Sequence, residues 1–290
     1  MNWNIKLAFI TPLFSHGATD EPEIRPASVR GMLHHWFRLV GGDIEQERSV
    51  FGGNANKESG CQAAAGKVVV RVSDIQARQG SQNTLPHKTG GAASPRSAFL
   101  AGTACTLRVF GRLGGLSGGE EALFRDAVYA WLLMGTLGYR STRAAGSFVW
   151  ESEDFPVPTP ENYQKAMDRL AAKGKFKAAL LPKEFADPGT PRSLVSNSLK
   201  MTEHNRPLGN IVYWTDGEKI PRKTSPLKYR LVRFGTRFQL VAVWDCRQAV
   251  TGNSPEDLHA VVKAFLRGVG NPPSTELGEL LAASALTQLP

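Results

Sequence analysis

Four basic side chains early in the chain have the types and spacing of a phosphate-binding helix face. Arg30, His34 and Arg38 recur every four residues, and side chains at that spacing lie on one face of an α-helix. Arg25 precedes them, near the expected start of the helix, where unpaired backbone amides attract anions. Because a guanidinium group can bind a phosphate through two parallel hydrogen bonds, these residues predict a row of phosphate contacts.

The same row also has a purely structural interpretation. Charged faces of surface helices are usually only solvated, and Arg25 could form an ion pair with Glu21 or Glu23. A solvated row binds no ligand, so the spacing alone leaves both interpretations open.

A glycine-rich segment, GTLGYRSTRAAGS at residues 135–147, is a second candidate binding loop. Gly138 and Gly146 allow the backbone to pass close to a ligand, and Arg140 and Arg143 supply guanidinium groups for phosphates. An ordinary helix-to-strand connection explains such a segment equally well. Taken alone, the loop therefore does not establish a binding site.

Groups that could perform catalysis are sparse. His34 and His35 are adjacent, so on a helix their side chains diverge by about 100° and cannot share a metal without other ligands. Asp20 has no partner acid or base nearby in the sequence outside its own acidic turn. Asp20 and His34 are the candidates for a catalytic group, and a solvated acidic turn is the competing interpretation of Asp20.

The cysteines indicate neither a disulfide framework nor a zinc site. Cys61, Cys105 and Cys246 are odd in number, far apart and without Cys-x-x-Cys spacing. No nucleotide-binding, hydrolase or metalloprotease motif occurs. We therefore expect reduced thiols, no metal and no cofactor.

Hydrophobic periodicity predicts the elements that must position these residues in the first half of the chain. Ile5, Leu7 and Phe9 recur at every second position, which is typical of a half-buried strand. The predicted elements are a strand at 4–13, a helix at 27–40, strands at 67–74 and 105–112, a helix at 120–134 and a strand at 147–151. This β-α-β-β-α-β order predicts a ferredoxin-like α+β domain.

The proline-rich stretch FPVPTP at residues 155–160 marks a connector, because prolines break helices and strand pairing. We place a boundary there between a ferredoxin-like domain at 1–155 and an irregular, degenerate ferredoxin-like α+β domain at 156–290. The predicted elements of the second domain are a basic helix at 161–177, strands at 209–214, 227–234 and 237–244, and a helix at 255–267.

The charge balance favours a polyanionic partner. The 290 residues carry 35 Lys and Arg against 26 Asp and Glu, a formal net charge of +9, and a basic surface gathers phosphates and releases their counterions. A polar, turn-rich loop at 76–97 either orders on a partner or is disordered. No long apolar run or signal-peptide pattern occurs, so we expect a cytoplasmic protein without membrane contact.

Three segments together carry a family resemblance. They are TPLFSHGATDEPEIRPASVRGMLHHWFRLVGG at 11–42 with VFGG at 50–53, GTLGYRSTRAAGS at 135–147, and RKTSPL at 222–227. Their order resembles the RAMP superfamily of CRISPR effector subunits, most closely the first-subunit family of the type III-B Cmr module. The first segment matches at over a dozen positions, and the resemblance covers about half of the chain.

The resemblance implies a non-catalytic RNA-binding subunit of a CRISPR ribonucleoprotein that serves antiviral defence. Such a subunit contacts guide RNA near its 3′ end and target RNA, next to other RAMP subunits. The implied RNA contacts are Arg25, Arg30, His34, Arg38, Gly138, Arg140, Arg143, Gly146, Arg222 and Lys223. One alternative is a RAMP-family endoribonuclease that cleaves guide precursor or target RNA through Asp20 or His34, and another is an adaptor that contacts acidic protein partners.

Overall fold

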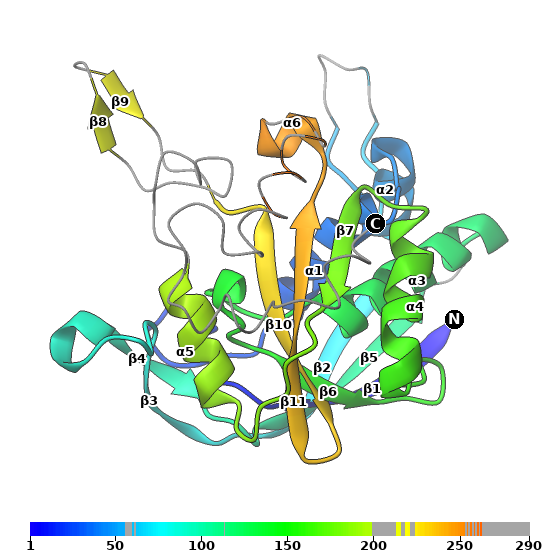
Figure 1. The fold of residues 1–290 in the computed structure, drawn as a ribbon. Helices are drawn as coiled ribbons and strands as arrows, with labels where there is room; N and C mark the ends of the chain where they lie inside the picture. Colours follow the sequence, from blue (N-terminus) through cyan, green and yellow to red (C-terminus); the bar gives the residue numbers. More distant parts are fainter. Residues whose placement is uncertain are drawn as a thin grey trace.

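The computed structural model is an α+β fold with antiparallel sheets (Figure 1). It describes residues 1–55, 60, 62–112, 114–198, 213–215, 218–220, 224–252, 254, 256, 258, 260 and 262. Arg222, Lys223 and Cys61 lie outside these residues, as does most of the predicted strand at 209–214 and of the helix at 255–267. In the described part, no helix has the length and apolar character needed to cross a membrane.

The first half contains a four-stranded antiparallel sheet in the order β2-β5-β1-β6. The strands are β1 (Asn2–Phe9), β2 (Val68–Gln76), β5 (Ala104–Gly111) and β6 (Phe148–Glu151). Along β1 every second side chain is buried, from Trp3 to Phe9, and those between are exposed or half-buried. This alternation gives the sheet one apolar face and one polar face.

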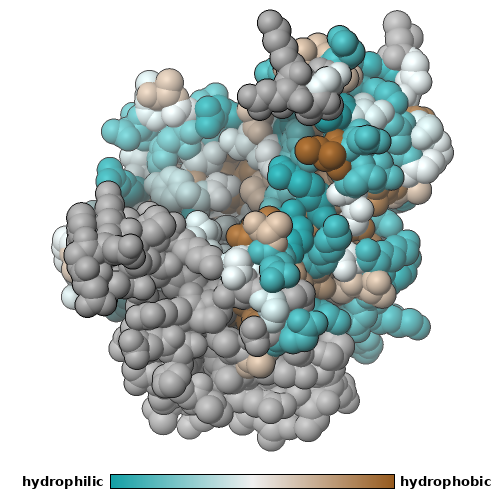
Figure 2. All heavy atoms as spheres, turned by 90° about the horizontal axis from the view of Figure 1, so that it is seen from above, coloured by the Kyte–Doolittle hydropathy of each residue, from teal (hydrophilic) through white to brown (hydrophobic). Residues whose placement is uncertain are grey.

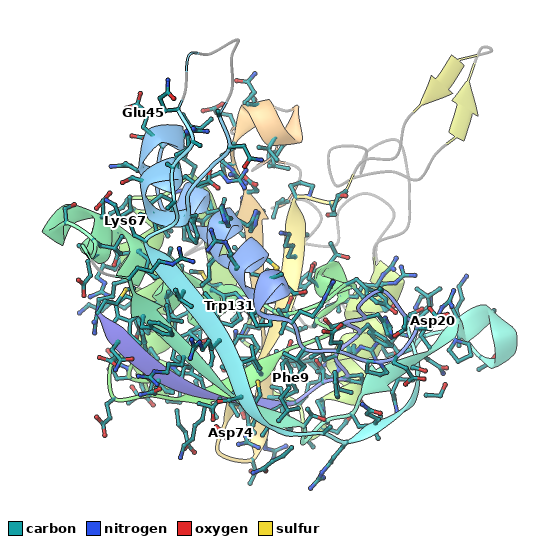
Figure 3. The ribbon with its side chains drawn as sticks, turned by 180° about the vertical axis from the view of Figure 1, so that it is seen from behind. Phe9, Asp20, Glu45, Lys67, Asp74 and Trp131 are labelled. Carbon is teal, nitrogen blue, oxygen red and sulfur yellow. The ribbon has the colours of Figure 1, made fainter. Side chains whose placement is uncertain are left out.

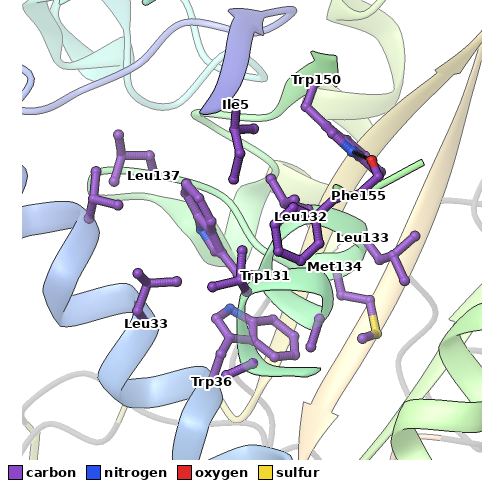
Figure 4. Close-up of a cluster of buried hydrophobic side chains, with 14 of the residues drawn as sticks. Ile5, Leu33, Trp36, Trp131, Leu132, Leu133, Met134, Leu137, Trp150 and Phe155 are labelled. Atoms are coloured by element: carbon purple, nitrogen blue, oxygen red, sulfur yellow. Dashed lines mark hydrogen bonds between the residues drawn. The ribbon is translucent and has the colours of Figure 1, made fainter. Parts of the chain in front are cut away.

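Helices α1 (Pro26–Leu39), α2 (Ile44–Phe51) and α3 (Gly118–Met134) accompany this sheet, and α1 and α3 bury its apolar face. The core contains Trp36 of α1 beside Trp131 of α3 (Figure 4), both almost fully buried. Each buried Leu or Phe side chain in such a core stabilises the fold by roughly 1.5–3 kcal/mol. The predicted succession of helices and strands in the first half agrees with the structure, except that α2 and a hairpin at residues 79–99 were not predicted.

The predicted loop at 76–97 is largely a β-hairpin. Strands β3 (Gln79–Asn83) and β4 (Pro95–Phe99) pair with each other, with a short 3-10 helix (Gly90–Ala93) between them. Most of their side chains are polar and exposed, although Ala98 and Phe99 at the end of β4 are buried. The sequence therefore lacks the apolar alternation that identifies a strand. A bridge between Leu13 and Phe99 joins the hairpin to the loop that follows β1.

The second half contains a three-stranded antiparallel sheet in the order β10-β11-β7. The predicted helix at 161–177 is too long, because α4 (Pro160–Ala171) ends earlier and β7 (Phe176–Leu180) follows. After α4 the chain passes close to α1, where the amide of Lys175 donates a hydrogen bond to the Leu39 carbonyl at 2.7 Å and Gly174 leaves no room for a Cβ. Phe176 and Lys177, which the prediction placed in the helix, instead pair with the central strand of this sheet. The other elements are α5 (Gly189–Ser198), β8 (Tyr213–Thr215), β9 (Glu218–Ile220), β10 (Leu227–Phe234), β11 (Arg237–Asp245) and α6 (Gln248–Thr251).

The hydrophobic core continues across the predicted boundary after residue 155. Tyr163 and Met167 of α4 and Val243 of β11 belong to the same buried cluster as Trp3 and Ile5 of β1. Seen from above, the described surface is mostly hydrophilic, and its apolar side chains are scattered (Figure 2). The division into two domains, and the ferredoxin-like character of each, stay predictions.

Candidate functional site

Arg30 of α1 is engaged inside the protein. Its guanidinium donates hydrogen bonds to the carbonyl oxygens of Val68 (3.3 Å) and Phe51, and its Cζ lies 5.5 Å from the centre of the Phe51 ring. Burial lowers the pKa of Arg30, and the neighbouring charge of Arg112 lowers it further. Arg30 therefore joins α1 to the end of α2 and to β2, and these contacts occupy donors that the sequence assigned to a phosphate.

The other two members of the predicted row face an acid on α2. Glu47 Oε1 lies 2.6 Å from Nδ1 of His34 and 3.2 Å from Nε of Arg38. The His34 ring also stacks on Phe51, with 3.9 Å between ring centres. The side chain of Arg38 is half exposed, so it is the most accessible of the three. The predicted row therefore forms part of the contact between α1 and α2, and the carboxylate of Glu47 balances its positive charge.

The sequence contains a signal for α2 that could have revealed this balance. Asp43 and Gln46 form a capping box, in which each side chain accepts a hydrogen bond from the other residue's backbone amide. This Asp-x-x-Gln spacing marks a helix N-terminus. A helix that begins there brings Glu47 within reach of α1.

His35 lies in a polar cluster between α1 and the second sheet. Its Nε2 lies 3.1 Å from Nζ of Lys228 on β10. Burial, the charge of Lys228 and that of Arg247 lower the pKa of His35 to about 3, so the ring is neutral at pH 7 and accepts this hydrogen bond. Asp245 forms a 2.5 Å ion pair with Arg247 beside it. His35 is therefore a packing residue between the two halves of the chain.

The glycine-rich loop and the loop after β1 form one joined structure. The amide of Tyr139 donates to the Phe14 carbonyl and the amide of Gly146 to the Pro12 carbonyl, both at 2.9 Å. The hydroxyl of Thr11 donates to the Ala144 carbonyl, also at 2.9 Å. Two of the segments that carry the family resemblance, far apart in sequence, thus meet.

The glycines of this loop allow its backbone to pass close to neighbouring backbone. Gly138 has a φ of +78°, and a Cβ there would lie 2.3 Å from the Phe14 carbonyl oxygen. Gly146 has a φ of +67°, and a Cβ would lie 1.9 Å from the Leu137 carbonyl oxygen. Only glycine fits such a left-handed backbone at this spacing. The close approach is to the protein's own backbone, where the sequence predicted a ligand.

Tyr139 is the exposed centre of a basic and aromatic cluster at this junction. It is 40% exposed, and its ring centre lies 5.4 Å from that of Phe14 and 5.7 Å from that of His16. Burial raises the pKa of Tyr139, while the charges of Arg96 and Arg140 oppose that rise. We call Tyr139, His16, Arg96 and Arg140 the Tyr139 cluster. Of these residues, only Arg140 was predicted as a contact; His16 and Arg96 belong to separate segments that the fold brings to Tyr139.

Arg25 and Arg143 lie near the ends of the two joined loops. Arg25 is the N-cap residue of α1. Its Nε is 4.0 Å from Oε2 of Glu23, and this is one of the two ion pairs that the sequence offered as an alternative to phosphate binding. Its side chain is still 43% exposed. Arg143 ends the 3-10 helix Ser141–Arg143 and is half-buried. Both lie on or beside the joined loops, and neither is fully enclosed.

Asp20 and His34 do not share a site. Asp20 is exposed and lies beside the β3–β4 hairpin, on the opposite side of the molecule from Glu45 of α2, the helix that pairs with His34 (Figure 3). Asp20 adds to the pKa rise of Tyr139, which places its charge near the Tyr139 cluster. Within the described ranges, no group of three or more His, Cys, Asp or Glu side chains could hold a metal ion.

Comparison with known proteins gives matches to a family and to solved structures. A model of the RAMP superfamily matches residues 6–149, and no curated protein matches. The crystal structure of Cmr1 from Pyrococcus furiosus in its apo form matches with a TM-score of 0.55 at 13% identity, over 84% of this chain and 88% of that chain. At this identity the likeness shows a shared fold.

Two further structures resemble the chain less closely. A chain of the type III-B Cmr-beta complex bound to cognate target RNA has a TM-score of 0.49 at 9% identity, over 90% of this chain and 99% of its own. A chain of a type IV-B CRISPR complex has a TM-score of 0.39 at 15% identity, over 55% and 94%. The family match itself runs from β1 to β6, and it shows that this chain belongs to the RAMP superfamily.

Proposed function

We propose that the chain is a non-catalytic RNA-binding subunit of a type III-B-like CRISPR ribonucleoprotein. In this role it contacts guide RNA near its 3′ end and target RNA, and it assembles with other RAMP subunits in antiviral defence. Membership of the RAMP superfamily and the fold shared with Cmr1 support this role. The formal net charge of +9 supports a polyanionic partner.

The observation that carries the proposal is the Tyr139 cluster. An exposed ring beside two arginines can stack on an unpaired base while the guanidinium groups bind its phosphates. The Tyr139 ring packs against the ring of Phe14, which is fully buried. The Phe14 ring is held in turn by Arg192 of α5, whose Cζ lies 5.4 Å from its centre. A ring supported in this way loses little conformational freedom when it binds a base.

The residues proposed to bind RNA differ in how available their side chains are. Arg140, with Tyr139 and Arg96, forms the main contact, and Arg25 and Arg143 border it. Arg30 holds the helices together, and His34 and Arg38 contribute as far as Glu47 leaves their charge available. RNA binding by Arg222, Lys223, Gly138 and Gly146 stays a prediction. The division into domains at 1–155 and 156–290 stays a prediction as well.

The ribonuclease alternative has one observation in its favour. Glu47 is hydrogen-bonded to Nδ1 of His34 at 2.6 Å, which is how a carboxylate orients a catalytic imidazole. His34 is 26% exposed. This alternative predicts cleavage of RNA by the purified chain that His34→Ala abolishes, or that Asp20→Ala abolishes if that carboxylate acts instead.

Binding of a labelled single-stranded RNA over a series of salt concentrations tests the proposal. We compare the full chain with Arg96→Gln/Arg140→Gln, with Tyr139→Leu, and with Arg233→Gln/Arg237→Gln, a control that removes two exposed arginines from the β10–β11 hairpin. The Arg96 and Arg140 substitutions should reduce the slope of log K against log salt by about 1.4, at about 0.7 for each phosphate contact. Absence of binding at low salt, or equal losses in the control, would contradict the proposal, and cleavage of the RNA would favour the ribonuclease.

A further inference from the structure

The polar face of the first sheet carries basic side chains that are not part of the Tyr139 cluster. Lys6 on β1, Arg71 on β2 and Arg108 on β5 are all exposed on this face, at the positions that alternate with buried side chains. Helices α1 and α3 bury the opposite face. In the described part of the chain, three adjacent strands thus present basic side chains on one open surface.

An aromatic ring lies among these charges. The Cζ atoms of Arg71 and Arg108 lie 5.2 and 5.4 Å from the centre of the Phe110 ring. Phe110 is half-buried, and Nε of Arg108 donates a hydrogen bond to Oδ1 of Asn2 at 3.2 Å. The guanidinium groups and the ring form a patch that is partly apolar and partly cationic, and its arginines are held by neighbours on three strands.

The two arginines are also unfavourably placed for stability. Arg71 and Arg108 are directly opposite each other in the β2–β5 register, and like charges at such positions destabilise a sheet. Among the described residues, neither forms an ion pair with a carboxylate. The nearest acids in the register are at the margins, with Glu151 opposite Lys6 on β6 and Asp74 near the end of β2. A polyanion bound across the strands would remove this repulsion.

We propose that the face formed by Lys6, Arg71, Arg108 and Phe110 is a second binding site for single-stranded RNA, separate from the Tyr139 cluster. Phosphates contact the two arginines and Lys6, and one base stacks on the Phe110 ring or on a guanidinium plane. The occupant is single-stranded because a flat sheet face offers stacking surfaces to unpaired bases, whereas the bases of a duplex are already stacked. The inference rests on the proposed function, which supplies RNA as the polyanion.

The test uses the full chain, a fluorescently labelled unstructured single-stranded RNA and a salt series. Arg71→Gln/Arg108→Gln should reduce the slope of log K against log salt by about 1.4, at about 0.7 for each phosphate contact. Phe110→Leu should weaken binding by about tenfold through the lost stacking, with the same RNA and salt. The control is again Arg233→Gln/Arg237→Gln, which removes the same charge from exposed strand-end positions.

Thermal unfolding provides a readout that separates binding from folding. Because Arg71 and Arg108 repel each other, the double glutamine variant should melt at the same temperature as the wild type or higher. A reduced slope together with an unchanged or raised Tm supports the site. An equal slope reduction in the control, or an affinity loss that tracks a lower Tm, would overturn it.

Three further outcomes distinguish the causes of failure. If the Arg96 and Arg140 substitutions weaken RNA binding and the Arg71 and Arg108 substitutions do not, the proposed function stands and the second site is wrong. If the wild type binds no RNA at low salt, both fail. If Arg71→Gln/Arg108→Gln leaves RNA binding intact but prevents association with other subunits of the complex, the face is a protein interface and the inference is wrong.

Discussion

Arg230 of β10 donates a 2.5 Å hydrogen bond to the carbonyl oxygen of Phe148 on β6. The same guanidinium donates to the Gly135 carbonyl at 2.6 Å and lies 4.4 Å from the centre of the Phe148 ring. Its side chain is fully buried. A single charged residue of the second half thus binds the end of α3 and the last strand of the first sheet.

We predict that Arg230→Ala lowers the free energy of unfolding by about 3 kcal/mol or more. The substitution leaves buried carbonyl groups without donors and removes a large buried side chain. Urea denaturation followed by circular dichroism measures the change. Arg233→Ala, an exposed neighbour on the same strand, should alter stability by less than about 0.5 kcal/mol. Similar losses in the two variants would contradict the role of Arg230 in joining the two halves of the chain.

Stability should fall in acid because of His35. The unfolded chain protonates this imidazole below a pH near its ordinary pKa of 6.5, whereas the folded chain holds the pKa at about 3. The unfolded state therefore binds more protons between these pH values, and the free energy of unfolding decreases as the pH falls from 6.5 towards 3. Lys228, Arg247 and Arg38 face the ring and oppose its protonation, while Asp245 favours it.

Chemical denaturation at pH 7 and pH 5 measures this dependence for the wild type and His35→Gln. The glutamine variant accepts a hydrogen bond from Lys228 but does not titrate, so its loss of stability between the two pH values should be smaller by about 1–2 kcal/mol. An identical loss in both proteins would show that other groups cause the acid sensitivity.

Gly146→Ala should destabilise the junction of the two loops. The backbone must move to accept a methyl group there, because φ is +67° and the new Cβ would lie 1.9 Å from the Leu137 carbonyl oxygen. We expect a loss of at least about 1–2 kcal/mol in the free energy of unfolding, together with weaker RNA binding because Tyr139 is displaced. The matched control is Gly91→Ala, where the added carbon would meet no atom within 4 Å beyond its own local backbone and chain neighbours. Equal stability of both variants would contradict this account.

Glu47→Gln tests whether the basic row on α1 lies on the RNA path. The substitution removes the carboxylate that pairs with His34 and Arg38. If RNA passes this face, the released charge should tighten RNA binding by about three- to tenfold at low salt, and more steeply as salt decreases. Asp168→Asn removes one acid from α4 as the control. Unchanged affinity in Glu47→Gln would remove His34 and Arg38 from the RNA contacts.

The elements that were predicted correctly in the first half are those with a local sequence pattern. Ile5, Leu7 and Phe9 alternate along β1, and Leu33 and Trp36 lie on one face of α1. The β3–β4 hairpin and α2 were missed, because short polar elements carry little periodicity. The helix at 161–177 was predicted too long, because the pairing of Phe176 and Lys177 with β11 joins residues that are distant in sequence.

The sequence by itself determined the basic character of the chain, the amphipathic elements and the family, because these depend on residue types and local spacing. The tertiary structure decided which charges are available. It paired Arg38 with Glu47, bound the guanidinium of Arg30 to backbone carbonyl groups, and brought Tyr139 near Arg96 from a separate segment. Burial, charge pairing and cross-strand register depend on distances between residues far apart in the chain, so local patterns do not contain them.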